Sequence, residues 1–198
     1  TVPPAVTAAT GVDAMAHCVE AFTNIRAHPL IDGYARMGIE LAGRNLARAV
    51  ADGSDADARA GMLLSSFYGG LCLGPVNTAA GHALAYPLGT RAGLPHGLSV
   101  ALVFPHVLAF NADARPEKTA EVTQALGLAP TCNAAEIAGT VAEWCSHLGL
   151  TMSLSAHGVA EGDLRFWAVE AHGIRRLMDN NPRDMSVDDI EAIYHAAF

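Results

Sequence analysis

Four residues in the first half of the chain have the types and the spacing of a catalytic metal site. Asp13 and His17 lie four positions apart, so on a helix their side chains would share one face. His82 and His96 follow fourteen positions apart, and each stands beside a glycine that permits close backbone approach. One carboxylate and three imidazoles can hold a divalent transition metal and leave one coordination position vacant. Catalytic metal sites need that vacancy, whereas structural zinc sites close it.

The other histidines have no comparable surroundings. His106 lies in an apolar stretch, which favours a hydrogen-bonded core residue or a support for a ligand over a ligand itself. The chain contains no His-Asp dipeptide, the motif of helical phosphohydrolases, and no His-Glu-x-x-His motif of zinc peptidases. The five histidines interpreted as ordinary are His28, His147, His157, His172 and His195.

The elements that must position these residues are predicted to be helices throughout, because apolar residues recur at helical intervals and strand-like alternation is rare. We expect Thr10 to cap the first helix, Pro87 to follow the end of the fourth and Pro105 to kink or interrupt the fifth. The fold class is therefore all-α, with residues 1–198 forming one helical metal-binding domain. The predicted helices cover residues 10–23, 30–51, 55–74, 77–86, 95–104, 116–126, 134–148, 162–178 and 186–197.

Composition limits the classes of protein and partner. The chain has 198 residues, of which 51% are hydrophobic and 16% charged, enough for a substantial core. Its net charge of −8 argues against nucleic acid and anionic lipid as partners. Four cysteines without a CxxC pair predict reduced thiols and a cytoplasmic location. No apolar run is expected to reach the length of about 18 residues that spans a bilayer. The first residue is not methionine, so we expect a piece of a longer protein.

Several segments of the chain resemble the iron-containing (group III) alcohol dehydrogenases. These are the segments 9–22, 81–89 and 95–97, together with Asn111-Ala-Asp and Asn181-Pro-Arg before the last helix. The likeness extends from Val2 to the end of the chain. It implies the helical C-terminal domain of the dehydroquinate-synthase-like architecture, with Asp13, His17, His82 and His96 as the ligands of one Fe(II) or Zn(II) ion.

The resemblance also implies a second domain that this chain lacks. Members of the family hold NAD or NADP mainly through an N-terminal α/β domain with a Gly-Gly-Gly-Ser loop, and no such loop occurs here. The implied activity is NAD(P)-dependent interconversion of an alcohol with an aldehyde or ketone, in which the metal polarises the substrate oxygen. We expect this chain alone to be an inactive fragment whose partner is that nucleotide-binding domain. A homo-oligomer, such as a dimer, is also expected.

The position of Tyr86 departs from the pattern of many family members, which carry a second histidine there, close to the nicotinamide. A phenol has a pKa of about 10 and is a poor proton shuttle at neutral pH. Tyrosine at this position is similar to the hydroxyacid–oxoacid transhydrogenases. A catalytic role for Tyr86 and a role as pocket wall both stay open, and Phe22, Phe67 and Leu84 are candidates either for pocket lining or for plain core.

Other functions within and outside this architecture remain alternatives. Dehydroquinate synthase is a lyase, glycerol dehydrogenases are zinc polyol oxidoreductases, and maleylacetate reductases are related enzymes. The complete set of one aspartate and three histidines favours the alcohol dehydrogenase branch. A helical module that holds metal or supports assembly without turnover is the non-enzymatic alternative.

Overall fold

The computed structural model describes residues 2–198, which form ten α-helices and three short 3-10 helices. No β-strand occurs within that range, so the predicted all-α fold is confirmed. The α-helices are α1 (Pro4–Thr23), α2 (Pro29–Ala51), α3 (Ala56–Leu73), α4 (Ala80–Thr90), α5 (His96–Asn111), α6 (Pro116–Ala125), α7 (Ala134–His147), α8 (Leu164–His172), α9 (Arg175–Met178) and α10 (Val187–Ala196). The 3-10 helices are η1 (Ala112–Ala114), η2 (Ser155–His157) and η3 (Glu161–Asp163).

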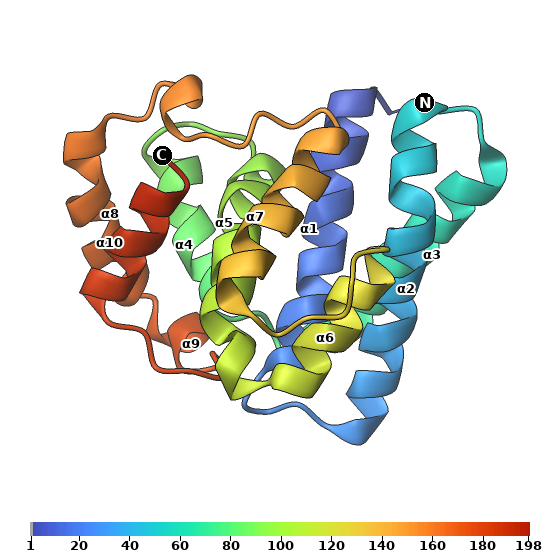
Figure 1. Cartoon of the computed structure of the whole chain (residues 1–198), viewed down its shortest axis with the longest axis horizontal. Helices are drawn as coiled ribbons and strands as arrows, with labels where there is room; N and C mark the ends of the chain where they lie inside the picture. Colours follow the sequence, from blue (N-terminus) through green and yellow to red (C-terminus); the bar gives the residue numbers. More distant parts are fainter. Residues whose placement is uncertain (1) are drawn as a thin grey trace.

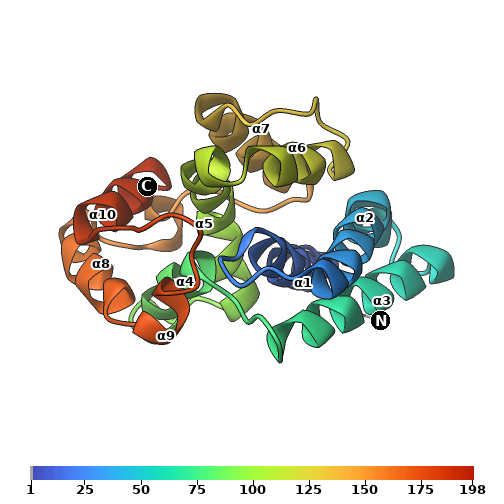
Figure 2. The same cartoon turned by 90° about the horizontal axis from the view of Figure 1, so that it is seen from below.

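Helix α1 lies in the middle of the N-terminal part of the fold. It packs against α2 and α3 on one side and against α5 on the other (Figures 1 and 2). Its sequence is rich in alanine, and most of its residues from Thr7 to Thr23 are buried. Small side chains let neighbouring helices approach α1 closely, which is the property that a metal site shared among helices requires.

Two hydrophobic clusters fill the interior, and α4 and α5 contribute to both. The first gathers α1, α2 and α7 around residues such as Met15, Phe22 and Leu46. The second gathers α8 and α10 around Leu164 and Tyr194. Figure 2 shows α4 and α5 between these two groups of helices. Both faces of α5 are therefore buried.

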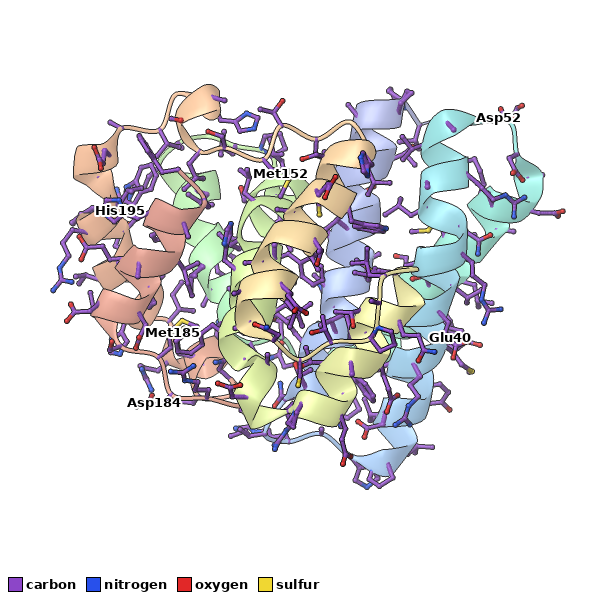
Figure 3. All side chains as sticks on the ribbon, in the orientation of Figure 1. Glu40, Asp52, Met152, Asp184, Met185 and His195 are labelled. Atoms are coloured by element: carbon purple, nitrogen blue, oxygen red, sulfur yellow. The ribbon has the colours of Figure 1, made fainter. Side chains whose placement is uncertain are left out.

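Burial on both faces explains why most residues of α5 are apolar. The stretch His96–Ala114 is long and apolar enough to cross a bilayer by length and composition, which the sequence analysis did not recognise. In the structure, 72% of its most apolar window is buried among the other helices. Charged side chains such as Glu40, Asp52 and Asp184 lie on the outer surface of the molecule (Figure 3).

Three helix boundaries differ from the sequence prediction. Helix α1 begins at Pro4 rather than after Thr10, and the Thr10 hydroxyl donates to the Val6 carbonyl within the helix, at 2.7 Å. Helix α4 continues through Pro87, and α5 continues through Pro105. A proline removes only one backbone donor, and both prolines are buried in close packing that keeps the helix going.

The predicted helix over residues 162–178 is divided into η3, α8 and α9. Ile174, with φ −80° and ψ 61°, leaves the helical conformation after Gly173 and ends the continuous helix. The chain then passes Asn181, whose side-chain amide exchanges two hydrogen bonds of 2.8 and 2.9 Å with that of Asn111. This amide pair fastens the segment before α10 to the end of α5.

The contact of α2 with α6 gives a test of the packing. An added Cβ at Gly43 would collide with the carbonyl oxygen of Ala125, so Gly43→Ala must push α6 away from α2. We expect the variant to lose about 1–3 kcal/mol of unfolding free energy, the usual cost of overpacking, in urea unfolding followed by circular dichroism.

Gly33→Ala in the same helix is the matched control. No atom lies within 4 Å of its added Cβ, so the variant should gain about 0.5–1 kcal/mol from helix propensity. If Gly43→Ala and Gly33→Ala changed the unfolding free energy equally, the result would contradict the close contact between α2 and α6.

Candidate metal centre

Three helices bring the candidate ligands together. Asp13 and His17 lie one turn apart in the middle of α1, His82 is the third residue of α4 and His96 is the first residue of α5. Pro95 precedes α5 and fixes the direction in which the chain enters it, and Gly97, the residue after His96, lies against the α1 backbone. The close approach expected beside His96 is therefore present: an added Cβ on Gly97 would lie 2.8 Å from the carbonyl oxygen of Ala9.

The Oδ1 atom of Asp13 is the centre of the cluster. It lies 3.3 Å from His82 Nε2, 3.6 Å from His96 Nε2 and 3.6 Å from His17 Nδ1. One ligand atom from each of Asp13, His82 and His96 falls within 4.8 Å of the other two. The structure thus gathers these three residues into a group compact enough to surround one metal ion.

His17 lies beside this group in a different orientation. Its ring is 4.4 Å from that of His82, centre to centre, and its Nδ1 is 2.8 Å from the backbone carbonyl oxygen of Asp13. That contact occupies Nδ1 as a donor and leaves Nε2 as the nitrogen that could bind a metal. His17 is therefore adjacent to the compact group without completing it.

The cluster is deep on one side and open on the other. The His82 side chain is only 5% exposed, whereas the His96 side chain is 50% exposed and lies at the mouth. A cavity of about 500 Å³ adjoins Asp13 and His96. Most of its wall is apolar and comes from the start of α1, from the first turn of α5 and from residues 149–151. A small organic molecule could therefore reach the ligands from this side.

Burial and neighbouring charges perturb the acid–base properties of the cluster. Burial alone disfavours the imidazolium of His82, but the carboxylates of Glu20 and Asp13 outweigh it and raise its pKa to about 10. Burial likewise opposes the charged form of Asp13, yet the three histidines hold the pKa of this carboxyl below its usual value. Burial and the nearby His82 lower the pKa of His17.

The donor atoms fit a divalent cation. Asp13 Oδ1 and His82 Nε2 face each other, are buried, and have no aligned hydrogen bond within residues 2–198. Buried polar atoms without partners are costly, and a cation between them would satisfy both. Imidazole nitrogen and carboxylate oxygen suit Fe(II) and Zn(II).

Sequence reasoning missed Glu20, Arg176 and His157. Glu20 follows Asp13 by seven positions and so shares its helix face, which is the signal that could have found it. Its buried carboxylate accepts a hydrogen bond from the backbone N–H of His82, at 3.0 Å.

His157, interpreted from the sequence as ordinary, lines the cavity beside the ligands. No local sequence pattern predicts its position, because η2, far from the ligands in the sequence, brings it there.

Tyr86 lies next to the mouth of the cluster, with its ring 6.3 Å from that of His96. Its hydroxyl accepts a hydrogen bond from Arg176 Nη2 at 3.0 Å, and the guanidinium lies 5.6 Å from the centre of its ring. The phenol is therefore engaged by a cation from α9. Tyr86 does not line the cavity next to Asp13 and His96, so both of its expected roles, pocket wall and catalysis, stay predictions.

The three candidates for pocket lining have different positions. Leu84 is fully buried in the second hydrophobic cluster, and Phe22 is buried in the first. Phe22 also borders a groove of about 520 Å³ between α2 and α6, which contains none of the candidate ligands. Phe67 is 58% exposed on α3. None of the three lines the cavity next to Asp13 and His96.

An all-helical fold with an aspartate–histidine cluster at a cavity is an arrangement that could hold a metal ion. Residues 7–198 match the family model described as the Fe-containing alcohol dehydrogenase family, C-terminal. The chain belongs to this family and corresponds to the C-terminal part of its members.

Individual relatives agree with this assignment. The chain is 36% identical to long-chain-alcohol dehydrogenase 1 of Geobacillus thermodenitrificans over 202 residues, which are 100% of this chain and 51% of that protein. The crystal structure of a 1,3-propanediol oxidoreductase superposes with a TM-score of 0.92 and 35% identity, covering 100% of this chain and 53% of the other. The sulfoacetaldehyde reductase of Bifidobacterium kashiwanohense, solved in complex with NAD+, gives a TM-score of 0.85 and 26% identity over 98% of this chain and 50% of that one. The chain spans about half the length of the curated relatives it matches.

The close approach of α5 to α1 supplies a test of the geometry. Gly97→Ala must displace the first turn of α5, and His96 with it, because the added Cβ would contact the backbone of Ala9. We expect a loss of about 1–3 kcal/mol in unfolding free energy and weaker zinc binding, measured by titration against a chromophoric chelator. Gly89→Ala in α4 is the control, because its added Cβ meets only one atom, the Leu94 carbonyl oxygen at 3.7 Å. Zinc binding that is equally strong in both variants would show that the spacing of α1 and α5 does not position His96.

Proposed function

We propose that this chain is the metal-binding half of an NAD(P)-dependent alcohol dehydrogenase that interconverts an alcohol with an aldehyde or ketone. The observation that carries the proposal is the compact group of Asp13, His82 and His96 at the edge of a cavity, in which Asp13 Oδ1 lies 3.3 and 3.6 Å from the Nε2 atoms of the two histidines. Membership of the Fe-containing alcohol dehydrogenase family supports the same reaction class. Iron is the expected metal, and zinc fits the same donors.

Asp13, His82 and His96 would hold the ion, and His17 would join them through its free Nε2. When bound, the ion would supply a Lewis acid that polarises the substrate oxygen. The set of one carboxylate and three neutral imidazoles keeps a net charge of about +1 on the loaded site, which favours an oxygen that becomes anionic. The cluster is open on the side of His96, whose side chain is half exposed, and a substrate oxygen would reach the ion from the cavity on that side.

The chain's own residues give the site its depth and its direction of access. His82 closes the inner end and excludes water, since its side chain is 5% exposed. His96 and the cavity wall direct a substrate toward Asp13. The wall is mainly apolar, so a small alcohol or aldehyde with an aliphatic part suits it, in keeping with relatives named for aliphatic alcohols.

The nicotinamide cofactor would be held mainly by a second domain, as expected from the length of the relatives. Exposed apolar side chains flank the site on the first turns of α1 and along α3, and they suit such a domain. Val6 is 47% exposed, and Phe67 and Leu63 are 58% and 74% exposed. Leu63 and Val2 also border one groove between these two helices. The NAD+ complex of the related sulfoacetaldehyde reductase supports a nicotinamide dinucleotide as the cofactor.

Elemental analysis of anaerobically purified chain tests the metal site. We expect about one equivalent of iron or zinc, lost in Asp13→Ala, His82→Ala and His96→Ala. Each variant removes a ligand, so its metal affinity should fall by more than the roughly 10–100-fold that an outer hydrogen-bonding partner contributes. His17→Ala should also lower the affinity if its Nε2 completes the site.

His106→Ala is the matched control for the histidine variants. His106 lies in α5, as His96 does, but it is outside the compact group of ligand atoms. The control should keep the full metal content. Undiminished metal in His96→Ala would remove that residue from the ligand set, and a metal-free parent chain after reconstitution would contradict the proposed site.

The proposed division of metal binding and dinucleotide binding between two domains gives a further prediction. The chain alone should bind metal but show negligible NAD(P)-dependent alcohol oxidation, because the proposed reaction needs a bound dinucleotide. Joining it to the N-terminal half of a relative such as the 1,3-propanediol oxidoreductase should restore turnover, followed as NADH absorbance. Robust turnover by the chain alone would contradict this division. A metal-loaded chain that stays inactive in the fusion would favour a binding module without catalysis.

A further inference from the structure

Glu20 is a buried carboxylate that belongs to no surface ion pair. It lies on α1, and only 7% of the residue is exposed. Its two oxygens accept hydrogen bonds from the backbone N–H groups of Ala79 and His82. These donors belong to the start of α4, a helix whose N-cap residue, Ala79, supplies no side-chain acceptor. Glu20 therefore performs from another helix the capping that α4 lacks, and its charge is favourable at a helix N-terminus.

The same carboxylate lies beside the ring of His82. Glu20 Oε2 is 3.2 Å from His82 Nδ1, and Asp13 Oδ1 is 3.3 Å from His82 Nε2 on the opposite edge of the ring. The ring thus stands between two carboxylates, one for each nitrogen. A metal ligand must present an unprotonated nitrogen, so a proton on Nδ1 leaves Nε2 free to face Asp13. Glu20 Oε2, at 3.2 Å, is placed to accept a hydrogen bond from that Nδ1–H after a small rotation of the ring, since the two atoms are not aligned as a hydrogen bond here.

Gly81 makes room for this arrangement. An added Cβ at Gly81 would collide with Glu20 Oε1, so no other residue type fits there without moving the carboxylate. The close backbone approach expected beside His82 is therefore the approach of the Glu20 side chain, and the sequence Gly81-His82 serves both the carboxylate and the ligand.

We propose that Glu20 is a positioning residue that fixes the orientation and the proton of His82, so that Nε2 is presented to a metal ion shared with Asp13. This inference rests on the proposed metal site. Metal-ligating histidines commonly donate their second ring N–H to a carboxylate, and loss of that partner lowers metal affinity by about 10–100-fold. Here the carboxylate also holds the first turn of α4, so one side chain sets both the place of His82 and its tautomer.

The test compares wild type, Glu20→Gln and a matched control by zinc titration against a chromophoric chelator. The amide of Gln keeps the shape but brings its own N–H donors toward the N–H groups of α4 and His82. We expect Glu20→Gln to bind zinc about 10–100-fold more weakly than wild type, with one equivalent at saturation. The control, Asp32→Asn, removes a carboxylate that pairs with Lys118 at 2.7 Å between α2 and α6. It should leave the zinc affinity of the folded chain unchanged.

A second readout separates positioning from a general effect on folding. In 15N NMR of the zinc-bound chain, His82 of wild type should show a single tautomer with the proton on Nδ1. Zinc on Nε2 enforces the same tautomer in Glu20→Gln, but the Nδ1–H signal of the variant should move upfield and exchange faster with solvent, because the carboxylate acceptor is gone. If Glu20→Gln does not fold, Gly81→Ala takes its place, since it displaces the carboxylate without removing its charge. The same zinc titration and NMR measurement are then made on Gly81→Ala.

The outcomes distinguish this inference from the proposed function. Zinc binding by wild type, together with unchanged affinity and an unchanged His82 Nδ1–H signal in Glu20→Gln, would overturn the role of Glu20 and leave the metal site standing. A wild-type chain that binds neither zinc nor iron would overturn the metal site and the role of Glu20 with it. Weaker binding accompanied by an upfield, faster-exchanging Nδ1–H signal, with Asp32→Asn behaving as wild type, supports the proposal.

Discussion

The arrangement of the site depends on one constraint: α4 and α5 must begin close enough to the middle of α1 for their first residues to reach Asp13. The 3.3 and 3.6 Å distances from Asp13 Oδ1 to His82 and His96 exist only because small residues line the contacts. Ala9 faces Gly97 at one contact, and the Glu20 carboxylate occupies the space beside Gly81 at the other. The fold thus fixes the ligands by backbone proximity, not through long flexible side chains. Rigid elements of this kind hold a site more precisely than loops do.

The electrostatics of the site follow from the same proximity. Asp13 and Glu20 are two largely buried carboxylates on one helix face, and buried charge is costly unless it is paired. His82 lies between them, which raises its pKa to about 10 despite the burial of its ring. A positive charge between these carboxylates therefore stabilises the packing, and either a protonated His82 or a metal ion would supply it.

The amino-acid sequence predicts the helices and most of the site, for identifiable reasons. The helical interval between apolar residues predicts the helices correctly. Asp13 and His17 can be recognised because a spacing of four positions places them on one helix face. Boundaries at Thr10, Pro87 and Pro105 were mispredicted because buried packing outweighs local breaking and capping signals. The division near Ile174 depends on one backbone conformation that composition does not reveal. Glu20, Arg176 and His157 escaped notice because their partners lie far away in sequence, and the orientation of His17 is decided by a contact to its own helix backbone.

The sharing of α4 and α5 between two hydrophobic clusters has a consequence for anyone who wishes to miniaturise this domain. All four candidate ligands precede residue 97, which suggests that the first half of the chain could be cut out as a small metalloprotein. Leu84, Leu88 and Leu102, however, are fully buried against the C-terminal cluster, and the Asn111–Asn181 amide pair joins the two parts. Excision would expose an apolar surface on the very helices that carry His82 and His96. The ligand-bearing segment is therefore not an autonomous module, and a reduced version would need a redesigned outer face on both helices.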